Sequence, residues 1–377
     1  MPTLRRRFAT PLMVLSTVVL LSACGSATNP AIPAGGPSTQ TSPGGAATTA
    51  GGTAPVDPTP IDPAPVNPRS VEGPSTAVLP LTDVQPVTAD PQPVLPATVT
   101  DNQGTKVTVR SDDRILALDR SGTLAATVYG LGLGPHLVGR DQSTGFPAAA
   151  SLPLVTSGAH VLSAEAILAL HPTVIITDTT LGPWDVLLQM RDSGIPVVVV
   201  TSDRDARTVD TLTSAIAAAL GVSAQGDLLN TRVTREITQA SAQITAELPA
   251  DPAQRLHIVF LYVRGQAGTY YIFGKGSGAD SLIDAVGGID VATEAGLDGY
   301  QPLTAEALAS LKPDVLLFMT EGLKSVGGID GALRLPGVAE TPAGQHRRIV
   351  DMNDYEVLAF GPRTASVIDA LATALYR

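Results

Sequence analysis

The sequence predicts an α/β protein of two similar lobes, each a mainly parallel sheet flanked by helices, joined by one long spine helix with a ligand cleft between the lobes. The first observation is a repeat: LSAEAILALHPTVIITD at residues 162–178 returns as LTAEALASLKPDVLLFM at residues 303–319. The second is that each copy reads as a capped helix, a Pro that ends it and an apolar run rich in strand formers, which is an αβ unit. The third is residues 223–248, a Pro-free stretch with helical apolar spacing between the copies. Because small ligands favour clefts between lobes, the repeat bears on function.

The N-terminus is typical of an exported protein. Three arginines precede a short apolar run, and LSAC ends at Cys24, the only cysteine. The run is too short to span a membrane, so we expect a signal peptide at residues 1–23. LSAC resembles the lipobox of bacterial lipoproteins, which implies that Cys24 is lipidated and anchors the protein on the extracellular face of the cell membrane.

Residues 24–98 are predicted to be the lipidated Cys24 followed by a disordered tether. The stretch from residue 25 to residue 100 holds 16 of the 31 prolines together with Gly, Thr, Ala and Ser, and it has no aromatic residue. Such a composition cannot bury enough apolar surface to fold. We therefore expect the N-terminal lobe at residues 99–220, the spine helix at 221–250 and the C-terminal lobe at 251–377.

Within the lobes, turn signals and apolar runs alternate in the order expected of a doubly wound sheet. We expect a hairpin at residues 99–109, strands at 114–119, 195–200 and 255–262, and helices at 121–133, 184–193 and 206–220. If the 141-residue register continues backwards without an insertion, Arg114 corresponds to Arg255 and Ser121 to Tyr262. In the same register His160 corresponds to Gln301.

These features together resemble a substrate-binding lipoprotein of an iron-chelate or cobalamin ABC importer. The resemblance covers roughly residues 95–377 and is carried by RILALDRSGT, GLGPHLVGRD, SAEAILALHP, the spine helix and GSGADSLIDAVGGIDVA. Within that group the sequence is most similar to haem-binding lipoproteins of Gram-positive haem uptake systems. The resemblance implies a receptor that binds ferric haem b outside the membrane and delivers it to a cognate permease and its ATPase, with upstream haem-binding surface proteins as possible donors.

The same resemblance implies the ligands of the haem iron. Similar haem binders use a His from the first lobe and a Tyr from the second, with an Arg two residues after the Tyr; this chain has His160, Tyr262 and Arg264 at matching places. Residues i and i+2 of a strand share a face, so we expect Arg264 beside the phenol of Tyr262, where its charge favours the phenolate. Without the resemblance, a lone loop His and a strand-end Tyr are more often ordinary surface or rim residues.

Glu165 and Glu306 occupy the same position of the two repeat copies, two residues after a Ser or Thr. An acid in the first turn of a helix complements the helix dipole, which alone explains both. The resemblance implies that they also dock the permease through its arginines. Four tyrosines and three arginines remain unranked candidates for contacts with the porphyrin and its propionates: Tyr270, Tyr271, Tyr300, Tyr355, Arg140, Arg347 and Arg363.

Two alternatives stay open. The same fold could carry a ferric siderophore or a cobalamin, ligands for which His160 and Tyr262 would be dispensable. An exported enzyme is disfavoured, because the sequence has neither G-x-S-x-G nor H-E-x-x-H. The net charge of −11 argues against nucleic acid and against an anionic membrane face, so we expect the protein to meet the membrane only through its anchor. We also expect a monomer.

Overall fold

The computed structural model describes residues 67–377 except residues 81 and 159. Cys24 and the expected signal peptide lie outside the described residues. No helix in the described part of the chain is both long enough and apolar enough to cross a membrane.

The first lobe is built on the parallel sheet β4-β7-β8, in which β4 and β8 flank β7. The hairpin β2-β3 lies next to it, and a second, short hairpin β5-β6 leads into α2. The elements are β2 Ala97–Thr100, β3 Lys106–Val109, β4 Ile115–Leu118, α1 Thr123–Val128, β5 Thr156–Ser157, β6 Val161–Leu162, α2 Ala164–Ala169, β7 Val174–Thr177, α3 Trp184–Asp192, β8 Val197–Val199 and α4 Val209–Ala219.

The second lobe is built on a larger sheet of order β1-β14-β13-β9-β10-β12, with β11 also paired to β9. Its strands β1, β14, β13 and β9 are parallel, whereas β10 and β12 are antiparallel to their neighbours. The elements are β9 His257–Arg264, β10 Thr269–Phe273, α6 Ala279–Ala285, β11 Ile289–Asp290, α7 Val291–Glu294, β12 Tyr300–Pro302, α8 Ala305–Leu311, β13 Val315–Met319, α9 Thr320–Ser325, α10 Gly328–Ala332, α11 Pro342–Gln345, β14 Ile349–Met352 and α12 Thr364–Tyr376.

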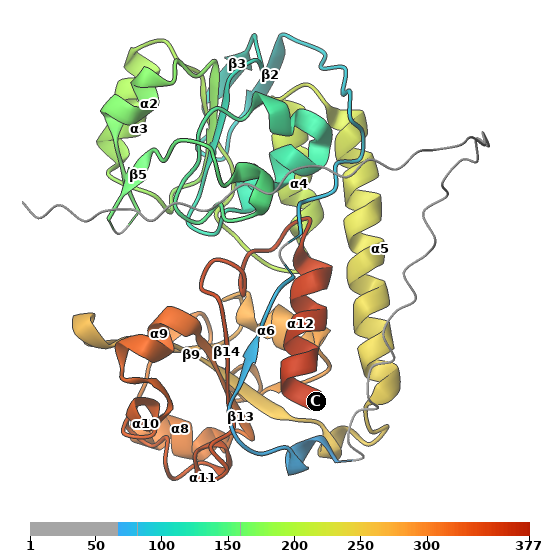
Figure 1. Ribbon diagram of the computed structural model, residues 1–377, viewed down its shortest axis with the longest axis vertical. Helices are drawn as coiled ribbons and strands as arrows, with labels where there is room; N and C mark the ends of the chain where they lie inside the picture. Colours follow the sequence, from blue (N-terminus) through green and yellow to red (C-terminus); the bar gives the residue numbers. More distant parts are fainter. Residues whose placement is uncertain (1–66, 81, 159) are drawn as a thin grey trace, which may run out of the picture. The chain divides into compact units, whose positions relative to one another are not determined.

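The helix α5, Ser223–Glu247, connects the lobes and packs against both of them. It contacts α4 of the first lobe and α12 of the second, as Figure 1 shows in yellow. One apolar core includes buried side chains of α5 and of both lobes, such as Leu229 and Val233, whereas two further cores fill the other faces of the two sheets. The two-lobed α/β fold with a spine helix is thus as predicted.

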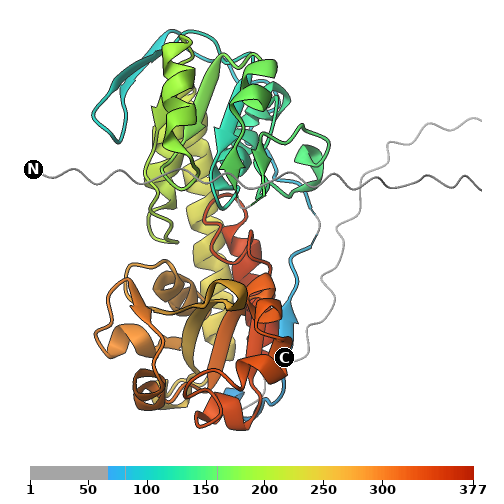
Figure 2. The same ribbon diagram turned by 90° about the vertical axis from the view of Figure 1, so that its left-hand side faces the viewer.

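An N-terminal strap, residues 67–96, departs from the expected tether. It contains the turn η1 (Pro68–Ser70) and the strand β1 (Ser75–Ala77), which pairs with β14 at the edge of the second-lobe sheet. Further on, Asp83 accepts a hydrogen bond from the backbone N–H of Ala148 at 2.6 Å, and Val87 donates to the carbonyl of Gly130 in the first lobe. The strap therefore contacts both lobes and runs from one to the other, blue to teal in Figure 2.

The backward extension of the repeat register is wrong by two residues. In the first lobe Ile115 pairs with Val174, and in the second Ile258 pairs with Val315. The strands β7 and β13 keep the 141-residue separation, but β4 and β9 are separated by 143, because the first lobe has two more residues between its paired strands. Consequently Tyr262 corresponds to Asp119, not to Ser121, and Arg114 corresponds to His257, not to Arg255.

Candidate functional site

His160 lies in the loop of the hairpin β5-β6, directly before α2. Its backbone is left-handed, with φ 65°, a conformation that few residues other than Gly adopt and that is often kept for function. Burial lowers the pKa of the imidazole, and the nearby positive charges of Arg120 and Arg264 lower it further. Its Nδ1 is buried and has no hydrogen-bond partner among the described residues. A neutral imidazole with a nitrogen to spare is the form that binds a metal.

Tyr262 lies near the end of β9, where parallel α/β sheets bind ligands. Alternation along β9 places it on the face opposite to His257, and its ring stacks on Phe273 at 5.7 Å between centroids. Arg264 shares this face. Its guanidinium carbon is 4.5 Å from the centroid of the Tyr262 ring, so it lies over the face of the ring and forms a cation–π contact with it.

Tyr262 belongs to an aromatic face of the second lobe, consisting of Phe260, Tyr262, Tyr271, Phe273 and Tyr300. Cross-strand pairing aligns these side chains, since Tyr271 is opposite Tyr262 on β10 and Tyr300 is opposite Phe273 on β12. Tyr300 is 58% exposed and Tyr271 37%. Phe260 and Phe273 are buried in the core, whereas the exposed Tyr271 and Tyr300 can stack on a flat conjugated ligand.

The loop that follows β14 joins the two halves of the site. Its Tyr355 comes from the second lobe, yet its ring lies 5.9 Å from that of His160, edge to face, and its hydroxyl accepts a hydrogen bond from Gln142 Nε2 at 3.0 Å. The preceding residue, Asp354, pairs with Arg264 at 2.7 Å. The structure therefore connects His160 to Arg264 and Tyr262 through two adjacent residues.

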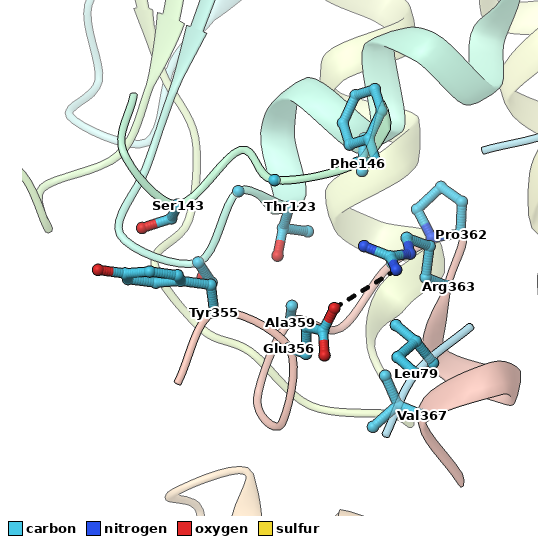
Figure 3. Close-up of a pocket in the computed structure, with 15 residues that line it drawn as sticks. Leu79, Thr123, Ser143, Phe146, Tyr355, Glu356, Ala359, Pro362, Arg363 and Val367 are labelled. Atoms are coloured by element: carbon cyan, nitrogen blue, oxygen red, sulfur yellow. Dashed lines mark ion pairs between the residues drawn. The ribbon is translucent and has the colours of Figure 1, made fainter. Parts of the chain in front are cut away.

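Figure 3 shows a pocket beside this loop, where Tyr355 lies near Ser143 and Glu356 faces Arg363. The ion pair between Glu356 and Arg363 is 3.5 Å long. The volume of the pocket is about 20 Å³, enough for one water molecule but far too small for a porphyrin. This pocket alone therefore cannot hold a large ligand.

Three of the other candidates from the sequence are engaged away from the aromatic face. Tyr270 packs into the core on the opposite face of the sheet. Arg140 donates to backbone carbonyls of its own loop, and Arg347 pairs with Asp330. The sequence analysis did not single out Arg120, whose charge lowers the pKa of His160. Its position just after the end of β4 could have indicated it, because Tyr262 lies near the end of the corresponding strand β9.

Glu165 and Glu306 are exposed in the first turns of α2 and α8. Ser163 and Thr304 cap these helices, accepting hydrogen bonds from the backbone N–H of Ala166 at 3.2 Å and of Ala307 at 3.1 Å. The expected helix-end geometry is thus confirmed in both lobes. Docking to a permease stays a prediction.

Comparison with known proteins gives consistent results. Residues 121–356 match the family model described as periplasmic binding protein. No curated protein matches the sequence. Among solved structures, the heme-binding protein HmuT is 41% identical, with a TM-score of 0.75; the match covers 82% of this chain and 99% of that one. Further structures of HmuT carry Ala in place of a His, of a Tyr and of an Arg two positions after that Tyr.

Two more distant structures extend the comparison. The periplasmic heme-binding protein RhuT from Roseiflexus sp. RS-1 is 36% identical, with a TM-score of 0.62, and the match covers 71% of this chain and 98% of that one. The periplasmic heme-binding protein HutB of Vibrio cholerae is 28% identical, with a TM-score of 0.60, and the match covers 71% of this chain and all of the other.

Proposed function

Because this chain belongs to the periplasmic binding protein family, we propose that it is a receptor that binds haem between its lobes and delivers it to an ABC permease for iron acquisition. It is a binding protein and not an enzyme. The observation that carries the proposal is the link between the lobes: Tyr355 contacts His160, and the adjacent Asp354 pairs with Arg264, which lies over Tyr262. The exposed Tyr271 and Tyr300 belong to the same face as Tyr262. HmuT, RhuT and HutB, which are all named as heme-binding proteins, support the proposal.

In this proposal His160 and Tyr262 are the two axial ligands of ferric haem. A free phenol costs roughly 4 kcal/mol to ionise at pH 7. Ferric iron together with the Arg264 charge offsets this cost, and Tyr is an established type of axial ligand to haem. The aromatic face would support the porphyrin, and Arg120, whose charge acts on His160, would meet a propionate.

Hemin titration of the soluble form that begins after Cys24 tests the proposal. Wild type should show a new Soret band, and Tyr262→Phe, which keeps the stacking on Phe273 but removes the ligand oxygen, should bind at least tenfold more weakly. The matched control is Tyr271→Phe, which removes a hydroxyl from the same face on the neighbouring strand and should change little. His160→Ala should alter the spectrum of the complex.

No Soret change with wild type would refute haem binding and leave the family assignment intact. In a ferric siderophore or a cobalamin, the metal offers no open coordination site for Tyr262 to bind. Tight binding of such a ligand, equal in wild type and Tyr262→Phe, would therefore favour that alternative.

Membrane attachment is part of the proposal. We expect Cys24 to carry the lipid that holds the receptor on the outer face of the cell membrane. The variant Cys24→Ser should fail to incorporate radiolabelled palmitate and should leave the membrane fraction. Incorporation that persists in this variant would contradict lipidation at Cys24.

The proposal assigns permease docking to Glu165 and Glu306. Charge reversal of both should abolish haem uptake by cells while hemin binding in solution stays unchanged. Asp185 is the matched control, because it is also an exposed acid in the first turn of a helix, α3. Uptake that survives in the double variant, or that is lost equally on Asp185→Lys, would count against docking.

A further inference from the structure

Asp354 is held rigidly by two different partners. Its Oδ1 accepts a hydrogen bond from Arg264 Nη2 at 2.7 Å, and its Oδ2 accepts from the backbone N–H of Glu321 at 2.8 Å, in the first turn of α9. Its side chain is only 8% exposed. The carboxylate thus has little freedom to leave Arg264.

Arg264 is also held in place, although its side chain is more exposed than that of Asp354. Its Nη1 donates to the carbonyl of Val263 at 2.9 Å, and a Cβ on Gly322 would lie 2.7 Å from the same Nη1. Glycine at position 322 leaves the space in which the guanidinium sits. This confinement holds the guanidinium over the ring of Tyr262, instead of in line with its hydroxyl.

The ion pair has a consequence for charge. A guanidinium that is paired with a carboxylate offers less net positive charge to a neighbour than a free one. If Tyr262 binds iron as phenolate, that phenolate must share Arg264 with Asp354. The two anions therefore compete for one cation.

We propose that Asp354 is a positioning residue that limits how strongly Arg264 supports the bond between Tyr262 and iron, which keeps bound haem releasable. This inference rests on the proposed function. A receptor that delivers its ligand needs a bond strong enough to capture haem and weak enough to surrender it. Asp354 weakens the bond enough for release, because it competes for the charge of Arg264.

A purely structural role would have Asp354 only cap α9, where Met319 provides no side-chain cap. The substitution Asp354→Asn separates the two roles. Asparagine keeps an oxygen that can accept from the backbone N–H of Glu321, but it removes the charge that compensates Arg264. The matched control is Glu356→Gln, which removes a charge two residues later, from an acid paired with Arg363 instead.

The test follows transfer of hemin from the loaded receptor to excess apomyoglobin by the change in the Soret band. We expect Asp354→Asn to release hemin on the order of tenfold more slowly than wild type, the change that corresponds to about 1.4 kcal/mol. Its visible charge-transfer band should also shift, because the bond from phenolate to iron is stronger. Glu356→Gln should match wild type in both measurements, and thermal unfolding of each variant reports any effect on the fold.

A double-mutant cycle decides whether Asp354 acts through Arg264. In the Arg264→Ala background, Asp354→Asn should have no further effect on release. Release that is unchanged or faster in Asp354→Asn, equal slowing in Glu356→Gln, or an effect that persists without Arg264 would each overturn the inference. If wild type takes up no hemin, the proposed function itself falls; if wild type binds hemin and only these comparisons fail, the proposed function stands.

Discussion

At the scale of single residues, Tyr355 covers His160 from the opposite lobe. The edge-to-face contact and the hydrogen bond from Gln142 hold the Tyr355 ring in place. We expect Tyr355→Ala to expose His160 and raise its rate of modification by diethylpyrocarbonate about two- to fivefold, as loss of a contact worth up to about 1 kcal/mol would. Mass spectrometry gives this rate relative to the exposed His171 in the same sample.

Tyr355→Phe serves as the control, because it keeps the ring against His160 and loses only the hydrogen bond. Its His160 should react nearly as slowly as in wild type. If Tyr355→Ala leaves the ratio of His160 to His171 modification unchanged, the ring does not shield the imidazole.

The sequence led to His160 and Tyr262 through the family resemblance, which matches a His just before the repeated helix and a Tyr at the end of a strand. Nothing comparable marks Asp354, and Tyr355 was only one of four unranked tyrosines. Both residues belong to the segment NDYE, residues 353–356, which follows the short buried strand β14. Their roles depend on the residues that the fold brings beside them from the ends of other strands. Arg264 lies beside the phenol of Tyr262 as expected, over the face of the ring; its ion pair with Asp354 was not foreseen.

At the scale of elements, the contact between α4 and α5 depends on a small residue. A Cβ on the buried Gly226 would lie 2.6 Å from the Cβ of Ala217. In an open helix Gly→Ala stabilises by about 1 kcal/mol, but here the overlap should dominate. We expect Gly226→Ala to lower the free energy of unfolding by about 1–3 kcal/mol in urea titrations.

The exposed neighbour Asp227 provides the comparison for this change. Asp227→Ala alters the same turn of α5 without approaching α4, so it should stay within about 0.5 kcal/mol of wild type. A Gly226→Ala protein that is more stable than wild type would show that the two helices can separate at little cost.

The strap should be needed for stability. Arg348 is 2% exposed and donates to the carbonyl of Gly73 at 3.0 Å and to Ser75 Oγ at 2.5 Å, and Leu79 is buried in the shared core. If the chain starts at residue 97 instead of 67, the guanidinium of Arg348 loses Gly73 and Ser75 as acceptors, and the core residues that contact Leu79 become exposed. The free energy of unfolding should fall by at least about 3 kcal/mol, measured by urea titration of the two forms.

Within the strap, Val94→Ala is the corresponding surface change, because Val94 is 78% exposed. It should have almost no effect. Equal stability of the forms that begin at residues 67 and 97 would contradict a structural role for the strap. The sequence predicted a tether here because the strap is rich in Pro. Its strand β1 has only three residues, which acquire their order by pairing with β14.

At the scale of the whole molecule, the repeat predicted two lobes correctly because helix caps and apolar runs are local signals. The register between the lobes depends on insertions in loops, which leave no periodic trace, and it was wrong by two residues. With the corrected register, Asp119 stands where the second lobe has Tyr262. The first lobe thus uses this strand end for a buried network of charges, and the second uses it for the candidate ligand.

That network consists of the buried acids Asp119, Asp141 and Asp178 and the cation Arg204. Arg204 Nη2 is 3.0 Å from Asp119 and 2.7 Å from Asp178. Burial, and secondly the charge of Asp119, raise the pKa of Asp141 to about 7 from 3.8. Between these two values the folded protein holds a proton that the unfolded chain has released.

Stability should therefore fall as the pH rises from about 4 towards 7 through this group, and level off above it. His160 acts in the opposite direction, since its lowered pKa weakens the fold as the pH falls below its ordinary value. The contribution of Asp141 is isolated by comparing wild type with Asp141→Asn in urea titrations at pH 5.5, 6.5 and 7.5. The variant should lose less stability than wild type over this range; an equal or steeper loss would mean that Asp141 is ionised throughout and that Arg204 offsets all three charges.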